Sequence, residues 1–261
     1  MASNPPSSVT RSDPIHENYY VPLKVADQIG SYLFYFVALL SLAVLVIDTS
    51  ALPTFNSAMN SIFLAASLAL FGLGTATRLY FAPRAEDARR QEFFATAFGV
   101  DMIDDRTVGY YNNFESDPSR KAAMQTLENS FFSKEIVRKM LRNERAVYAV
   151  YAIAWIVCVT VREAPITFVI WSAQIVFSEQ IIARWLRLEW LRNRFEDSYK
   201  QLHTLFISGS KKTFRAYAMT YVSTYEATKA SGGISLSTSI FEKLNPSLSQ
   251  QWEIVRQRLN P

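Results

Sequence analysis

Cysteine and histidine are scarce in this sequence. Its 261 residues include one cysteine, Cys158, and two histidines, His16 and His203. A single cysteine cannot form an intrachain disulfide, so nothing in the sequence indicates an oxidising compartment. The histidines lie far apart, and neither has cysteines or acidic residues at metal-ligand spacing, which argues against a zinc site. No combination of nucleophile, base and orienting residue stands out, so we expect no enzyme activity, no cofactor and no metal centre.

The N-terminus lacks the parts of a cleaved signal peptide. Residues 1–27 open with the Pro/Ser-rich MASNPPSSVTRSDP, which has no basic start, no short apolar core and no small-residue cleavage site. We expect a disordered polar segment there. The net charge of +4 is modest and forms no clear basic stripe, so direct DNA or RNA binding is not expected.

Charged residues are absent from two long runs near the start of the chain. Residues 28–47 and 49–77 contain no Asp, Glu, Lys or Arg. About 20 apolar helical residues cross the hydrocarbon core of a bilayer. The sequence therefore predicts a first transmembrane hairpin over residues 28–77, with the lipid bilayer as its surroundings.

A second hairpin is predicted over residues 146–186. Its charge-free stretches, Ala146–Val161 and Ala164–Ser178, are short for a membrane span. They reach a spanning length if the flanking Arg145 and Arg184 extend to the membrane surface. The alternative is a buried hairpin of a soluble domain.

Basic residues indicate the orientation of both hairpins. The loop between the first two spans holds no Lys or Arg and the loop between the last two holds one, Arg162, while three basic clusters flank the other span ends. Because positive residues stay on the cytoplasmic side, we predict a multi-pass protein with both termini cytoplasmic. The clusters are Arg78, Arg84, Arg89 and Arg90; Arg138, Lys139, Arg142 and Arg145; and Arg184, Arg187, Arg192 and Arg194.

The remaining residues predict one mostly helical cytoplasmic domain, so the fold class is an all-α integral membrane protein. An insert over 78–145 and a C-terminal region over 187–261 together have the size of an ordinary domain. In the insert, one helix ends at Gly99, and a second begins near Ser119 and can run straight into the third span. We interpret three tyrosines spaced by four residues as core positions: Tyr217, Tyr221 and Tyr225.

Two features of the spans are candidates for packing or a pore. Small residues fall on one face of the second span, which lets another helix approach closely, although alanine is also common in any span. A carboxylate near the end of the fourth span, Glu179, with Gln174 close by, faces either a pore or partner, or the interface beside Arg184. The small residues are Ser61, Ala65, Ala69, Gly72 and Ala76.

Two stretches of the cytoplasmic part are candidates for ligand binding. TVGYYNNFESD holds aromatic and amide groups that can stack on and read bases, or that simply plug the domain. SGSKKT offers backbone N–H groups and two lysines to a phosphate, without the upstream glycine of a P-loop. The candidate ligand residues are Tyr110, Tyr111, Asn112, Asn113, Lys211 and Lys212.

The order of hairpin, basic insert, hairpin and helical extension resembles the four-span effector family of bacterial cyclic-oligonucleotide defence systems, the S-4TM group. RRQEFFATAF enters the insert on a helix, TLENSFFSKEIVRKMLRNER leaves it, and GYYNN loosely echoes the aromatic and asparagine step of the family's insert. The resemblance implies a homo-oligomer that disrupts the inner membrane in antiviral defence, after a partner enzyme makes a cyclic oligonucleotide. Two alternatives stay open: a sensor or scaffold that the spans only tether, and an integral-membrane enzyme.

Overall fold

The computed structural model describes residues 12–46, 53–108, 115–160 and 182–259. Within these residues every regular element is a helix, and the one β-type pairing is an isolated bridge between Ser12 and Val108, so the predicted all-α class is confirmed. The elements, of which η1 and η2 are π-helical turns, are η1 (His16–Tyr20), α1 (Val21–Val46), α2 (Pro53–Ala76), η2 (Thr77–Phe81), α3 (Ala82–Phe98), α4 (Pro118–Thr160), α6 (Arg184–Ser208), α7 (Phe214–Gly232) and α8 (Thr238–Leu259).

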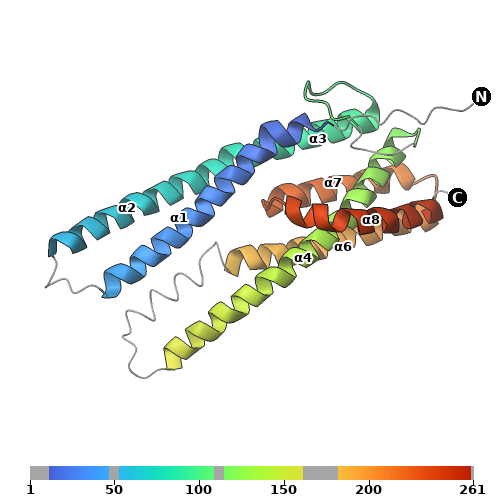
Figure 1. The fold of residues 1–261 in the computed structure, drawn as a ribbon. Helices are drawn as coiled ribbons and strands as arrows, with labels where there is room; N and C mark the ends of the chain where they lie inside the picture. The colour runs from blue at the N-terminus through green and yellow to red at the C-terminus, as the bar shows by residue number, and fades with distance from the viewer. Residues whose placement is uncertain (1–11, 47–52, 109–114, 161–181, 260–261) are drawn as a thin grey trace, which may run out of the picture.

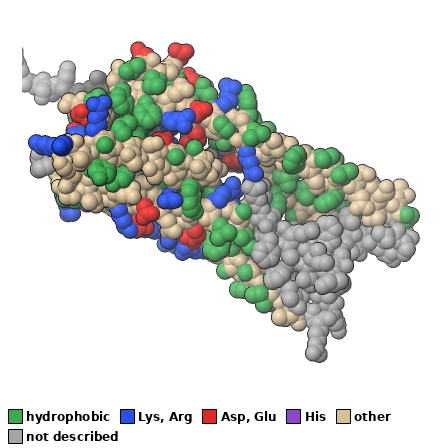
Figure 2. All heavy atoms as spheres, turned by 180° about the vertical axis from the view of Figure 1, so that it is seen from behind, with side chains coloured by type: hydrophobic (Ala, Val, Ile, Leu, Met, Phe, Trp, Pro, Cys, Tyr) green, Lys and Arg blue, Asp and Glu red, His purple; other side chains and the backbone are tan. Residues whose placement is uncertain are grey.

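Helices α1 and α2 form an antiparallel hairpin that projects from the rest of the molecule (Figure 1). Their apolar side chains point outward: Tyr32, Leu39 and Phe71 are 76%, 67% and 74% exposed. Figure 2 shows Lys, Arg, Asp and Glu side chains gathered at the opposite end of the molecule, and the arm itself carries none over residues 28–46 and 53–76. Water would hydrate such a surface poorly, whereas hydrocarbon would match it.

The structure supports two of the four predicted spans. Two helical stretches are long and apolar enough to cross a membrane, His16–Ser41 and Pro53–Phe98. The described part of the third predicted span, residues 146–160, is the end of α4 and does not qualify as a third such helix. Its short charge-free stretch is the physical reason, because α4 carries Arg142, Glu144 and Arg145 directly before it. The fourth predicted span lies almost entirely outside the described residues.

Helix α4 is the longest of the described helices and the centre of the packing of α3, α6, α7 and α8. The Asp117 carboxylate accepts a hydrogen bond from the backbone N–H of Arg120 at 2.8 Å, which satisfies one of the free donors of the first turn. From there α4 runs unbroken over 43 residues to Thr160. The expectation that this helix begins near Ser119 and continues into the third predicted span is therefore confirmed for its described part.

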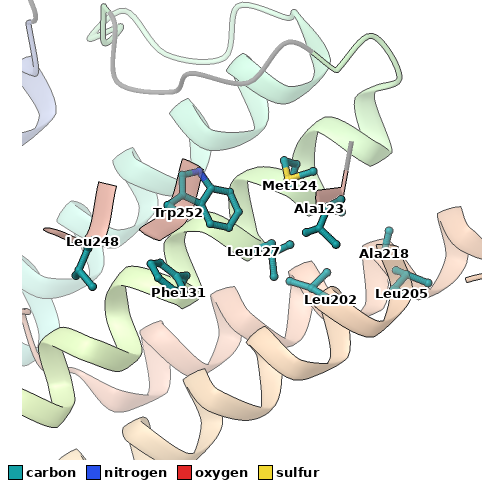
Figure 3. Packing of buried hydrophobic residues seen from close by; sticks show 10 residues of the cluster. Ala123, Met124, Leu127, Phe131, Leu202, Leu205, Ala218, Leu248 and Trp252 are labelled. Atoms are coloured by element: carbon teal, nitrogen blue, oxygen red, sulfur yellow. The ribbon is translucent and has the colours of Figure 1, made fainter. Parts of the chain in front are cut away.

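The core lies where α4 meets α6, α7 and α8. Figure 3 shows Leu127 and Phe131 of α4 facing Leu202 of α6 and Trp252 of α8. A second cluster continues along α4 toward its C-terminal end and includes Leu141, Leu188 and Tyr225. The insert and the C-terminal region, far apart in sequence, thus bury their apolar side chains against each other, which is the main stabilising contribution to such packing.

Helix α3 joins the arm to this core. It continues α2 through η2 and ends where Gly99 adopts φ 68°, a left-handed conformation that confirms the expected helix end. Phe93 and Ala97 of α3 pack against Ala122 of α4 and Val222 of α7.

Candidate functional site

The SGSKKT stretch forms the tight turn between α6 and α7. The Ser210 carbonyl accepts hydrogen bonds from the N–H groups of Thr213 at 3.0 Å and Phe214 at 2.9 Å. Glycine is required at position 209, because a Cβ there would lie 2.3 Å from the Leu205 carbonyl oxygen. The turn leaves Lys211 and Lys212 exposed at its tip.

A groove of about 440 Å³ runs beside this turn, between the end of α6 and the start of α7. Its lining combines a larger apolar surface with hydroxyl and amide side chains, one lysine and two tyrosine rings. The lining residues are Lys200, Gln201, Thr204, Leu205, Ser208, Gly209, Ser210, Thr213, Tyr217 and Tyr221. Such walls suit a small ligand with hydrogen-bonding groups and a flat ring. The described residues include no group of three or more His, Cys, Asp or Glu that could hold a metal ion.

Two of the three tyrosines interpreted as core residues instead border this groove. Tyr225 is buried, but Tyr217 is 51% exposed and Tyr221 is half-buried. The rings of Tyr217 and Tyr221 stack, with centroids 6.1 Å apart and planes 29° apart. Tyr221 still packs against the core beside Ala218, so the interpretation is wrong for the exposed Tyr217 and holds in part for Tyr221. A helical repeat does not say where along its length a face is covered.

The residues Tyr110, Tyr111, Asn112 and Asn113 lie outside the described residues, but both borders of their stretch are anchored. Before it, Glu92 accepts hydrogen bonds from the Thr107 N–H at 3.1 Å and the Thr107 hydroxyl at 2.6 Å.

After the stretch, Glu115 pairs with Arg120 at 3.1 Å. The Arg120 guanidinium lies over the rings of Phe206 and Phe214, 5.1 and 5.2 Å from their centroids. These rings flank the turn of Lys211 and Lys212. The structure thus brings the far border of the first candidate stretch to the second.

The packing candidates are placed only in part. Gln174 and Glu179 lie outside the described residues. On α2, Ser61, Ala65, Ala69 and Gly72 are exposed and Ala76 is half-buried, while the neighbouring Ala66 is buried. A Cβ added at Gly72 would meet nothing within 4 Å. The small-residue face therefore lies away from α1, and its contact with another helix stays a prediction.

A partly buried charge cluster between α3 and α7 was not anticipated from the sequence. The Lys229 ammonium lies 3.4 Å from the Glu86 carboxylate of α3 and 3.2 Å from the Glu226 carboxylate of its own helix. The Tyr20 hydroxyl of η1 donates to the other oxygen of Glu86 at 3.1 Å. Beside them Arg89 pairs with Asp13 at 2.8 Å. Tyr225 of α7 also shares a hydrogen bond with Ser133 of α4. Five segments therefore meet in and around this cluster: the residues before η1, then η1, α3, α4 and α7.

The cluster keeps Lys229 charged. Burial by itself lowers the pKa of the ammonium, but the Glu226 and Glu86 carboxylates raise it well above its ordinary value of 10.5. Burial also raises the pKa of the Tyr225 phenol, so this hydroxyl stays protonated and can hydrogen-bond Ser133 at 3.0 Å. The spacing of Glu226 and Lys229 by three residues was the only local signal of this site, and it is a common surface pattern.

No protein-family model, no curated protein and no solved structure matches this chain.

Proposed function

We propose that the chain is a membrane effector that oligomerises and permeabilises the inner membrane when its cytoplasmic helical unit binds a signal of the cyclic-nucleotide type. The resemblance to four-span effectors of antiviral defence supplies the class of signal. In this proposal two hairpins span the bilayer, and the clusters around α4 form the sensing unit on the cytoplasmic side.

The continuity of α4 is the observation that carries the proposal. Its first half is surrounded by α3, α6, α7 and α8, and its last turns expose Ile153, Ile156 and Val157 at 62%, 55% and 54%. No break separates the two halves. Because α4 then moves as one rigid body, a shift of its first half inside the sensing unit also displaces its apolar end.

The placement of the ends supports four spans in two hairpins. In Figure 1 the tip of the α1–α2 hairpin and the apolar end of α4 lie on the same side, opposite α7 and α8. The described arm begins and ends beside the sensing unit, as a spanning hairpin must. Both termini are cytoplasmic in this proposal.

The groove beside the α6–α7 turn is the ligand site of this proposal. The stacked Tyr217 and Tyr221 present a ring surface to a base, and Lys211 and Lys212 lie at the turn that borders the groove. A ligand shifts an equilibrium only by its preference for one state, and a tenfold preference supplies about 1.4 kcal/mol for each subunit. An oligomer adds these contributions, which favours assembly of several copies.

Leakage from liposomes that carry the purified chain tests the proposal. A cyclic oligonucleotide should release an entrapped dye from wild-type liposomes. Replacing Lys211 and Lys212 by alanine should abolish the response, since the phosphates lose both cationic partners. The matched control replaces Lys243 and Arg258, two exposed cations of α8, and should respond like the wild type.

The alternative is a tethered sensor, which the two supported spans are enough to anchor. Binding of the nucleotide without leakage, even when the chains are clustered artificially, would establish that alternative. If the nucleotide neither binds nor causes leakage, the effector proposal fails and the groove is also ruled out as the ligand site.

A further inference from the structure

The arm meets the sensing unit at two π-helical turns. Turn η1 lies directly before α1, and η2 lies between α2 and α3, so each helix of the arm has one at its inner end. The π-helical hydrogen-bond pattern is rare, and single π-helical turns are frequent at functional sites. Both turns contact α1, so they lie close together at the inner end of the arm.

Beyond these turns, α3 makes the main packing contacts between the arm and the sensing unit. Within the described residues its principal partners there are α4 and α7, whereas α1 and α2 pack chiefly on each other and on η1 and η2. The apolar part of the joint is small, with Phe93 and Ala97 against Ala122 and Val222.

The charge cluster crosses this same joint. Glu86 is held at both carboxylate oxygens, one by Tyr20 of the arm's first turn and one by Lys229 of α7. Lys229 has a second carboxylate, Glu226, on its own helix. If α3 moves away, Lys229 keeps one partner, so the α7 side of the joint remains satisfied after opening.

We propose that Tyr20, Glu86 and Lys229 form a latch that holds α3, and the arm attached to it, against the sensing unit, and that η1, α3 and the arm leave α7 together when the latch opens. An ion pair with a spare partner suits a reversible latch, because neither state strands a buried ammonium. In the proposed effector this latch couples ligand binding to movement of the arm, and only this role rests on the proposed function. Its physical existence is testable without ligand and without leakage.

Hydrogen exchange of the full chain in lipid nanodiscs tests the latch. Glu86→Gln keeps the shape of the side chain and its bond to Tyr20 but removes the charge that Lys229 faces. We expect exchange in η1, η2 and α3 to rise together by about tenfold, while α6 and α8 stay within about twofold of the wild type. The matched control is Glu196→Gln, which removes the charge from an exposed pair with Lys200 that has an N–O distance of 3.0 Å.

Three results would overturn the proposal. Unchanged exchange in η1, η2 and α3 of the Glu86→Gln variant would show that the pair of Glu86 and Lys229 does not hold the joint. An equal rise throughout α6 and α8 would make the pair a support of the whole fold instead of a latch. A similar rise of the arm in the Glu196→Gln control would assign the effect to lost charge in general.

Discussion

Buried polar side chains decide how α7 sits against its neighbours. Tyr225 is 1% exposed, packs on Phe195 with ring centroids 5.4 Å apart, and shares a 3.0 Å hydrogen bond with Ser133 of α4. Most of its contribution comes from the ring, which excludes water from the joint of α4, α6 and α7. The hydroxyl adds direction, since only one rotation of α7 brings it to Ser133.

Removing that hydroxyl should cost little but measurably. Tyr225→Phe leaves the Ser133 hydroxyl without this partner in a dry site, so we expect the free energy of unfolding to fall by about 1 kcal/mol. Denaturant titration in a mild detergent measures it. Tyr217→Phe is the control, because this hydroxyl belongs to an exposed side chain and should change nothing measurable. Equal losses in both variants would contradict the structural assignment.

The charge of Lys229 predicts a pH dependence. Its pKa in the folded chain lies above the value of 10.5, so the folded state holds the proton more tightly than the unfolded state. The contribution is complete below pH 10.5 and is lost as pH rises through the folded pKa.

Lys229→Met should therefore be less stable than the wild type by about 2 kcal/mol at neutral pH, since two carboxylates lose their partner. Unfolding titrations from about pH 6 to about pH 9 should give a constant difference, which shrinks only in more alkaline solution. A difference that already shrinks between pH 6 and pH 9 would show that another group titrates in the cluster.

At the scale of the elements, α4 is the helix on which the others depend. Leu127 is fully buried where α4 meets α6 and α8 (Figure 3). Leu127→Ala removes three buried carbon atoms and leaves a cavity, so we expect a loss of about 3 kcal/mol in the free energy of unfolding.

Unfolding followed by circular dichroism checks the effect of Leu127→Ala. The control is Ile207→Ala on α6, whose side chain is 66% exposed and should tolerate truncation within about 0.5 kcal/mol. A loss at position 207 that equals the loss at 127 would mean that the end of α6 is covered by a second copy of the chain.

For the whole molecule, the central question is which side of the membrane each part faces. Cysteines placed one at a time in a Cys158→Ser background answer it with an impermeant thiol reagent applied to intact cells. Positions 54, 116 and 231, which hold Thr54, Ser116 and Ser231, are all exposed in the structure. A cysteine at 54 should react from outside, because it lies beside the tip of the α1–α2 hairpin.

Cysteines at 116 and 231 should stay unlabelled until the cells are opened, since both belong to the sensing unit. Labelling at 116 from outside would reverse the orientation inferred from the arginine clusters. If none of the three positions is labelled in intact cells and all three react after lysis, the α1–α2 hairpin does not span the membrane.

The sequence by itself determined the local features of this protein. Two runs without charges are enough to predict the two long apolar helices of the arm, because charged side chains are costly in hydrocarbon and membrane-spanning helices rarely carry them. Gly99 ends α3 because its left-handed backbone is costly for other residues. Asp117 and Pro118 start α4 in the same local way, through a cap and a preset backbone angle.

Only the tertiary structure decided what those helices do to one another. Glu86 and Lys229 lie on helices far apart in the chain, and nothing local at either residue predicts that they meet. Tyr217, Tyr221 and Tyr225 share a helical repeat, yet one is buried and two border a groove, because burial depends on where α7 has neighbours. Periodicity reports which residues share a face, whereas the packing of distant helices sets which part of that face is covered and which polar groups are paired.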